Sequence, residues 1–139
     1  MIETIQEAIV TELLTITDIG TVAAWQGDIG DLDEILQIPQ KLPALHVIYH
    51  GGEYGEKKVM GANKVEVNMQ FMLIAVTKNL KGRKEGASAS YTLIEAVRTK
   101  LMGYKILPYG FLWPVREDLL RALGGVQIYG LIYRLNANI

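Results

Sequence analysis

The stretch that decides the fold is KVEVNMQFMLIAVT, residues 64–77. In its first half, apolar residues alternate with Glu66, Asn68 and Gln70, which is the period of a β-strand with one buried face. After Phe71 both sides of the alternation are apolar, as expected for a central strand covered on each face. The stretch therefore predicts one long strand in the middle of a sheet.

Other strands are predicted on either side of this one. Residues 44–50 and 126–135 show the same alternation, and residues 21–26 form a shorter apolar run. In the first of these, Leu45, Val47 and Tyr49 share one face, and His46, Ile48 and His50 share the other. In the last, Val126, Ile128, Gly130, Ile132 and Arg134 face one side and Gln127, Tyr129, Leu131 and Tyr133 the other. Gly124-Gly125 predicts a two-residue hairpin turn before the last strand, while residues 111–123 are ambiguous between strand and short helix.

Two helices are predicted, over residues 2–17 and 87–102. Apolar residues recur in each at intervals of three and four, giving one buried stripe. Gly20 and Gly103 are the expected stops, and Ser88 is the candidate N-cap of the second helix. The stripes consist of Ile2, Ile5, Ile9, Leu13 and Ile16 in the first helix and of Tyr91, Ile94, Val97 and Leu101 in the second.

Three connections between these elements are the candidate contact regions for partner proteins. Residues 27–43 form an acidic connection with a helical turn near 33–36, residues 51–63 a glycine-rich hairpin arm, and residues 78–86 a charged loop. Such loops carry many binding sites because they are exposed and variable. The candidate contact residues are Asp31 and Asp33 in the acidic connection, Gly52, Tyr54, Lys57 and Lys58 in the arm, and Lys81, Arg83 and Lys84 in the basic loop.

The order of elements predicts an α+β fold. Strands that follow one another through short turns favour a mixed, mostly antiparallel sheet, with the two helices packed on it. The length of 139 residues suits a single domain, 1–139, with one core and no need for a disulfide or metal.

The composition excludes several classes of protein. There is no cysteine, so there can be no disulfide, thiolate zinc site or cysteine nucleophile. The formal charge of −1 lacks the basic excess typical of nucleic-acid binding. Glutamates interrupt the start of the chain and no run of about 18 apolar residues occurs, so neither a signal peptide nor a membrane span is expected. We therefore expect a cytoplasmic protein without a membrane partner.

No residue pattern predicts catalysis, a cofactor or a metal. His46 and His50 lie four apart, but on a strand this spacing is roughly 13 Å, too far for one zinc ion. They are expected to be half-exposed strand residues. Helix capping accounts for Ser88 without a nucleophilic role. The acidic group Asp28, Asp31, Asp33 and Glu34 lacks the glycine and glutamate positions of a calcium loop. The glycine-rich arm lacks a phosphate-loop motif.

The whole layout resembles the small tail proteins of Mu-like contractile phages and prophages, which are related to the tail terminators of long-tailed phages. The segments that carry the resemblance are MIETIQEAIVTELL, PALHVIY, VEVNMQFMLIAV, ASYTLIEAVRTKL and GVQIYGLIYRL. The resemblance implies a ring of about six subunits that caps the tail tube and contacts the head–tail connector. Tube or sheath protein would be a further partner, in the host cytoplasm during assembly and in the virion tail afterwards. It also implies that residues 111–123 form a strand, and it brings no catalytic residue.

Two other classes stay open. One is a small ligand-binding or regulatory α+β domain of a bacterium, which would show an enclosed apolar pocket with a few polar groups. The other is an enzyme whose site joins His46, His50 and the acidic connection.

Overall fold

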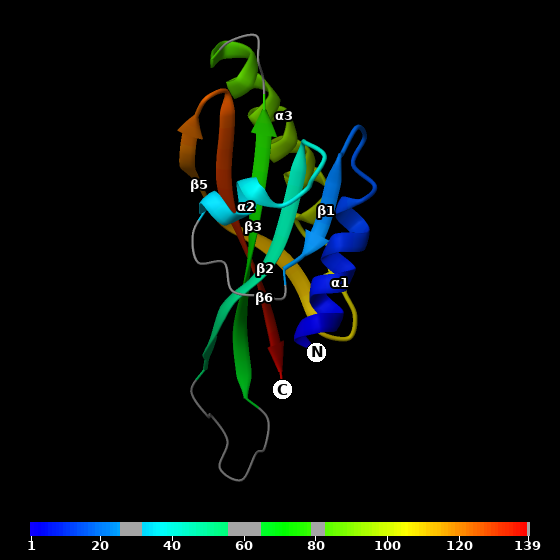
Figure 1. Cartoon of the computed structure of the whole chain (residues 1–139). Coiled ribbons are helices and arrows are strands. Elements are labelled where there is room, and N and C mark those ends of the chain that lie inside the picture. The colour runs from blue at the N-terminus through cyan, green and yellow to red at the C-terminus, as the bar shows by residue number, and fades with distance from the viewer. Residues whose placement is uncertain (26–31, 56–64, 79–82, 139) are drawn as a thin grey trace.

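The structure is a six-stranded sheet with helices on both faces (Figure 1). The computed structural model describes residues 1–25, 32–55, 65–78 and 83–138. The strand order is β1-β2-β3-β6-β5-β4; all neighbouring pairs are antiparallel except the parallel pair of β1 and β2. The strands are β1 (Thr21–Ala24), β2 (Ala44–Tyr54), β3 (Glu66–Lys78), β4 (Lys105–Ile106), β5 (Gly110–Leu123) and β6 (Val126–Asn138). The predicted α+β class is confirmed.

In the described part of the chain, three helices cover the sheet, one more than predicted. Helices α1 (Ile2–Leu13) and α3 (Arg83–Leu101) pack on one face, and the short α2 (Leu32–Gln37) packs on the other. The main core lies under α1 and α3, and a smaller core forms where Ile35 of α2 meets Ile74 and Ile128 of the sheet. None of the helices in the described ranges is long and apolar enough to cross a membrane.

β3 is the central strand, as predicted. It pairs with β2 on one side and along its whole length with β6 on the other. Phe71 and Leu73 are fully buried under the helices, while Ile74 and Val76 are buried on the α2 side. The half of the strand with apolar residues on both faces is therefore the half that is covered twice.

Helix α1 ends earlier than predicted. It stops at Leu13, and hydrogen bonds from Thr15 N to Glu12 O and from Ile16 N to Leu13 O continue the chain as turns. Asp18, with φ of 63°, then redirects the backbone into β1. Gly20 is not the helix stop: a Cβ there would lie 2.2 Å from the Lys41 carbonyl oxygen, so glycine is needed for a close backbone approach.

β2 is longer than predicted and contains the first part of the expected arm. The strand continues through Gly51 and Gly52 to Tyr54, paired with β3, with a bulge between Tyr49 and Gly51. Gly51, at φ of 143°, supplies the conformation that this bulge requires. The faces of β2 agree with the sequence pattern, but His46 is buried rather than half-exposed; His50 is exposed.

Helix α3 begins four residues before its predicted start. Ser88 therefore lies inside the helix, where its carbonyl oxygen accepts a hydrogen bond from Thr92 Oγ1, and it is not the N-cap. Tyr91 is more than half exposed, so it is not part of the buried stripe. Ser90 takes the inward position instead, bonded to Thr77 Oγ1 at 2.6 Å and to Gln127 Oε1 at 2.8 Å. The small polar side chain brings α3 close to the sheet.

Residues 110–123 form strand β5, which settles the ambiguous stretch. The hairpin to β6 turns at Gly124 and Gly125, with φ of 59° and 80°, as the primed two-residue turn requires. Both faces of β6 agree with the predicted alternation, Leu131 and Tyr133 lying under the helices and Ile128 and Ile132 on the other side. Bulges near Pro114 and between Leu119 and Arg121 let β5 stay paired with β6 along its length despite the proline.

Candidate interaction surfaces

The predicted contact residues lie in different structural settings. Gly52 and Tyr54 are at the far end of β2, opposite Met69 and Val67 of β3, and Tyr54 is 70% exposed. Arg83 and Lys84 lie in the first turn of α3 instead of in a loop, and Asp33 lies in α2. Lys57, Lys58, Lys81 and Asp31 lie outside the described residues.

A different surface, on β5, was missed by the sequence reasoning. Four of its large apolar side chains are exposed: Phe111 54%, Trp113 45%, Val115 45% and Leu120 38%. We call these four residues the β5 surface. Leu119, 54% exposed, lies opposite Tyr129 on the face of α3 and is not part of it. An exposed apolar cluster on this scale marks an interaction site more often than a single exposed residue does. The available signal was the set of large apolar residues within 111–123, a stretch that the sequence left ambiguous between strand and short helix.

Among the residues that the structure describes, only the start of the outer edge of β5 is covered. β4 pairs with Gly110 and Phe111, and the backbone of Leu112 bonds to Gly103 N and Tyr104 O. Within the described ranges, no strand pairs with the outer edge of β5 from Trp113 onward. A long strand edge with exposed apolar residues is a surface that proteins usually cover.

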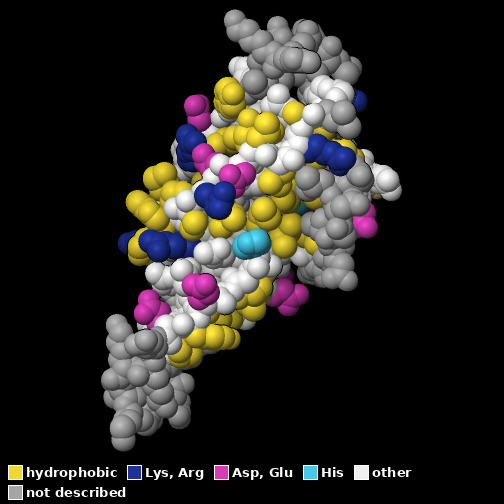
Figure 2. Space-filling view, turned by 90° about the vertical axis from the view of Figure 1, so that its left-hand side faces the viewer, with side chains coloured by type: hydrophobic (Ala, Val, Ile, Leu, Met, Phe, Trp, Pro, Cys, Tyr) yellow, Lys and Arg dark blue, Asp and Glu magenta, His cyan; other side chains and the backbone are white. Residues whose placement is uncertain are grey.

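Charged residues lie among the apolar ones on this side of the molecule (Figure 2). The register places Trp113 opposite Arg134, Arg116 opposite Ile132 and Asp118 opposite Gly130, on the sheet face away from α1 and α3. Arg116 Nε donates to Asp118 Oδ2 at 2.7 Å, and this ion pair raises the pKa of the arginine. Phe111 and Trp113 meet edge to face, with ring centroids 6.5 Å apart, beside a shallow hollow next to Arg134.

The opposite side of β5 carries a second ion pair, which joins the sheet to α3. Arg98 donates to Glu117 from both Nε and Nη2, a bidentate arrangement with fixed geometry. The hydrogen bond to Glu117 and its charge raise the pKa of Arg98. The helix face of β5 is therefore occupied within the chain, whereas the β5 surface is open.

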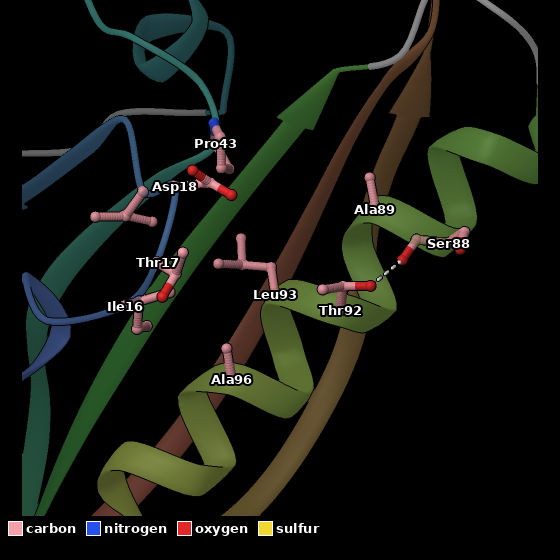
Figure 3. A pocket seen from close by; sticks show the side chains of 10 residues that line it. Ile16, Thr17, Asp18, Pro43, Ser88, Ala89, Thr92, Leu93 and Ala96 are labelled. Atoms are coloured by element: carbon pink, nitrogen blue, oxygen red, sulfur yellow. Dashed lines mark hydrogen bonds between the residues drawn. The ribbon is translucent and has the colours of Figure 1, made fainter.

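A groove lies between α3 and the connection from α1 to β1 (Figure 3). It has a volume of about 430 Å³ and is lined by Ile16–Ile19, Pro43 and the side of α3 from Ser88 to Ala96. Ala89 and Ala96 are small, which leaves the space open, and Leu93 forms part of the lining. The exposed residues Thr17, Asp18 and Thr92 make it an open groove instead of an enclosed pocket.

The histidines do not form a site. His46 Nε2 lies 2.7 Å from Gln40 Oε1 and the ring meets Trp25 edge to face, while burial lowers the pKa of the imidazole. Its Nδ1 has no hydrogen-bond partner within the part of the chain that the structure describes. In the same part, no three His, Asp or Glu side chains gather as metal ligands. Asp28 and Asp31 lie outside the described residues, so the acidic connection as a whole is not compared with His46.

Comparison with known proteins identifies a family. The sequence model of the family "Phage tail terminator protein" matches residues 7–139 of this chain. A chain in the structure titled "Virion of native gene transfer agent (GTA) particle" has a similar fold, with a TM-score of 0.60 and 14% sequence identity. The likeness covers 96% of this chain and 94% of that one. Curated protein sequences give no significant match.

Proposed function

Because this chain belongs to the phage tail terminator family, we propose that it ends the growing tail as a ring of about six subunits placed on the tail tube. The observation that carries the proposal is the family match over residues 7–139, which includes every strand of the sheet. Assignment to the Mu-like contractile phages stays a prediction from the sequence layout.

Exposed surface on the single subunit supports self-assembly. The β5 surface places four large apolar side chains in water. A ring of identical subunits would cover such a surface in every copy, which gives the apolar burial that drives association.

The further partners we propose are the tail tube or sheath protein and the head–tail connector. The candidate contacts with them are Gly52 and Tyr54 at the end of β2, together with Lys57, Lys58, Lys81, Arg83, Lys84, Asp31 and Asp33. Tyr54 supports the choice, because a tyrosine that is 70% exposed at the tip of a strand can serve as an interface anchor. We propose that the chain has no catalytic activity, since the family is a structural one.

Native mass spectrometry at micromolar concentration tests the ring, and electron microscopy of tubes tests its role. We expect a closed oligomer, and we expect its addition to polymerising tube protein to stop tube growth at one end. A protein that stays monomeric at every concentration and leaves tube length unchanged would contradict the proposal.

A small-ligand function is the second candidate, and the groove beside α3 is the observation that favours it. Its open form suits an apolar side chain of a partner better than an enclosed metabolite. A thermal-shift screen distinguishes ligand binding from a structural role. A metabolite that raises the melting temperature of the wild type, but not that of a variant with the groove filled by Ala96→Phe, would support ligand binding.

A further inference from the structure

We propose that the outer side of α1 in one copy docks on the β5 surface of the next copy, so that this pair of surfaces forms the repeated contact of the assembly. The inference rests on the proposed function, because it names the contact that would build the ring. Its partner is a second copy of this chain.

The charges of the two surfaces are opposite. On the β4–β6 part of the sheet face away from α1 and α3, Lys105, Arg116 and Arg134 outnumber Asp118, giving three positive charges against one negative charge. α1 carries Glu3, Glu7 and Glu12 and no Lys, Arg or His. Opposite fields of this kind guide two surfaces together and set their orientation.

The outward residues of α1 also have the right chemistry for an apolar partner. Glu3, Glu7, Thr11 and Leu14 recur at intervals of three and four and are all exposed, while Ile5, Ile9 and Leu13 face the core. Leu14 is 55% exposed at the end of the helix and Ile2 is 40% exposed at its start. Apolar groups at both ends with glutamates between them match the β5 surface, where Arg116 lies between the aromatic pair Phe111–Trp113 and Leu120.

The size of the β5 surface suits a specific contact. An aromatic side chain has roughly 150–250 Å² of surface and an aliphatic one less, so the four residues of the β5 surface at their exposed fractions offer roughly 300 Å². A standard interface takes roughly 800 Å² from each partner, with an apolar centre and a polar rim. The β5 surface supplies that centre, and the surrounding charges supply the rim.

The two surfaces face opposite sides of the sheet. α1 packs on the helix-covered face near β1 and β2, whereas β5 is at the other end of the strand order (Figure 1). Within one copy, the outer side of α1 therefore cannot contact the β5 surface. Two different surfaces that meet head to tail produce a ring when the rotation closes and a filament when it does not.

The contact is made by side chains, not by adding a strand. Pro114 has no backbone N–H, and the bulges near Pro114 and Leu119 interrupt the regular spacing of the edge. Such features discourage pairing with another strand. A helix laid across the exposed side chains needs no regular edge.

Cross-linking tests the contact directly, because the chain contains no cysteine and each variant then carries a single thiol. Thr11→Cys labels the outer side of α1, and Asn136→Cys labels the hollow beside Trp113 and Arg134. With a short bismaleimide, we expect the mixture of the two variants to give far more cross-linked dimer than either variant alone. Thr99→Cys on α3 is the matched control, since Thr99, like Thr11, is exposed and bonds its own helix backbone. The proposal would be overturned if each variant cross-linked only with itself. It would also be overturned if a mixture of Thr99→Cys and Asn136→Cys gave as much dimer as the mixture of Thr11→Cys and Asn136→Cys.

Charge reversal gives a second, independent measurement. Arg134→Glu and Glu7→Lys should each weaken self-association, measured by sedimentation equilibrium, by roughly tenfold, and the double variant should recover most of the loss. Lys41→Glu changes the net charge as Arg134→Glu does, lies beside Thr21 at the start of β1 and should have little effect. Equal loss in the control and no recovery in the double variant would count against the contact.

The results separate this inference from the proposed function. Rings of wild-type protein without the heterotypic cross-link would refute the α1–β5 contact and leave the ring intact. The cross-link in open filaments would refute the ring and keep the contact. Failure of both assembly and cross-linking would refute both.

Discussion

The hydroxyl of Tyr133 is the best place to test the packing of this fold. The side chain is 1% exposed on β6, between Phe71 of β3 and Pro114 of β5. Its oxygen is buried and has no hydrogen-bond partner in the described part of the chain. Burial raises the pKa of this hydroxyl to about 12, with the negative charge of Glu117 adding to the effect and Arg98 opposing it. We expect Tyr133→Phe to stabilise the protein.

The magnitude follows from the cost of an unpaired polar group. A buried hydroxyl without a partner costs about 1–3 kcal/mol, and phenylalanine keeps the same ring packing. We expect a gain of about 1 kcal/mol for Tyr133→Phe at pH 7. In urea, with a slope of about 2 kcal/mol/M for a chain of this size, the unfolding midpoint should rise by about 0.5 M. Tyr133→Ala is the control, and loss of the buried ring should cost about 3–5 kcal/mol.

The same substitution has a predicted pH dependence. The folded-state pKa of Tyr133, about 12, is higher than the ordinary value of 10. The contribution of the neutral Tyr133 to the stability of the wild type is therefore fully present below pH 10. It is lost as the pH rises toward the folded-state pKa. At pH 11 the wild type should have lost about 1.4 kcal/mol relative to Tyr133→Phe, in addition to the difference at pH 7.

Two results would refute this reasoning. A Tyr133→Phe variant that is less stable than the wild type at pH 7 would mean that the hydroxyl makes a favourable hydrogen bond. A difference between the two proteins that stays constant from pH 8 to pH 11 would mean that the pKa of Tyr133 is not raised.

Three further predictions concern the β1–β2 side of the sheet. Gly20→Ala should lower stability by about 1–3 kcal/mol or more in thermal unfolding, because the new Cβ would lie 2.2 Å from the Lys41 carbonyl oxygen; an unchanged melting temperature would exclude this close approach. Gln6→Leu should cost about 1–3 kcal/mol in urea unfolding, because Gln6 Nε2 donates to Val47 O at 2.6 Å and joins α1 to the sheet; a more stable variant would contradict this. Burial lowers the pKa of His46 below 6.5, so stability should be full above pH 6.5 and fall as the pH drops through the lowered value. His46→Gln should remove this part of the acid dependence, and an unchanged acid profile would show that His46 does not contribute to it.

Much of the fold could be predicted because it depends on local patterns. The alternation in residues 64–77 identifies β3, and the point where both faces become apolar marks where it is covered twice. The Gly124-Gly125 turn also follows from local chemistry, because only residues that accept positive φ fit it. The boundaries of α1 and α3 were less accurate, since tertiary contacts, and not helix propensity, decide where a helix ends.

The candidate contact surface could be predicted only in small part. Loops with charge and glycine were the visible signal, and Tyr54 at the end of β2 is the exposed residue among them that the structure describes. The β5 surface gave a misleading signal, because exposed apolar residues in a strand have the same sequence pattern as buried ones. Whether Trp113 is exposed depends on which face of the sheet the helices cover, and α1 and α3 pack on the opposite face from Trp113.

By itself, the sequence determined the α+β class, the central strand, the faces of β6 and the absence of cysteine chemistry, because each depends on residue identity or short-range periodicity. Only the tertiary structure decided that Gly20 serves a backbone contact, that His46 is buried and that the β5 surface is exposed. These features depend on which segments meet in space, and a residue's neighbours across a sheet are not encoded in its neighbours along the chain.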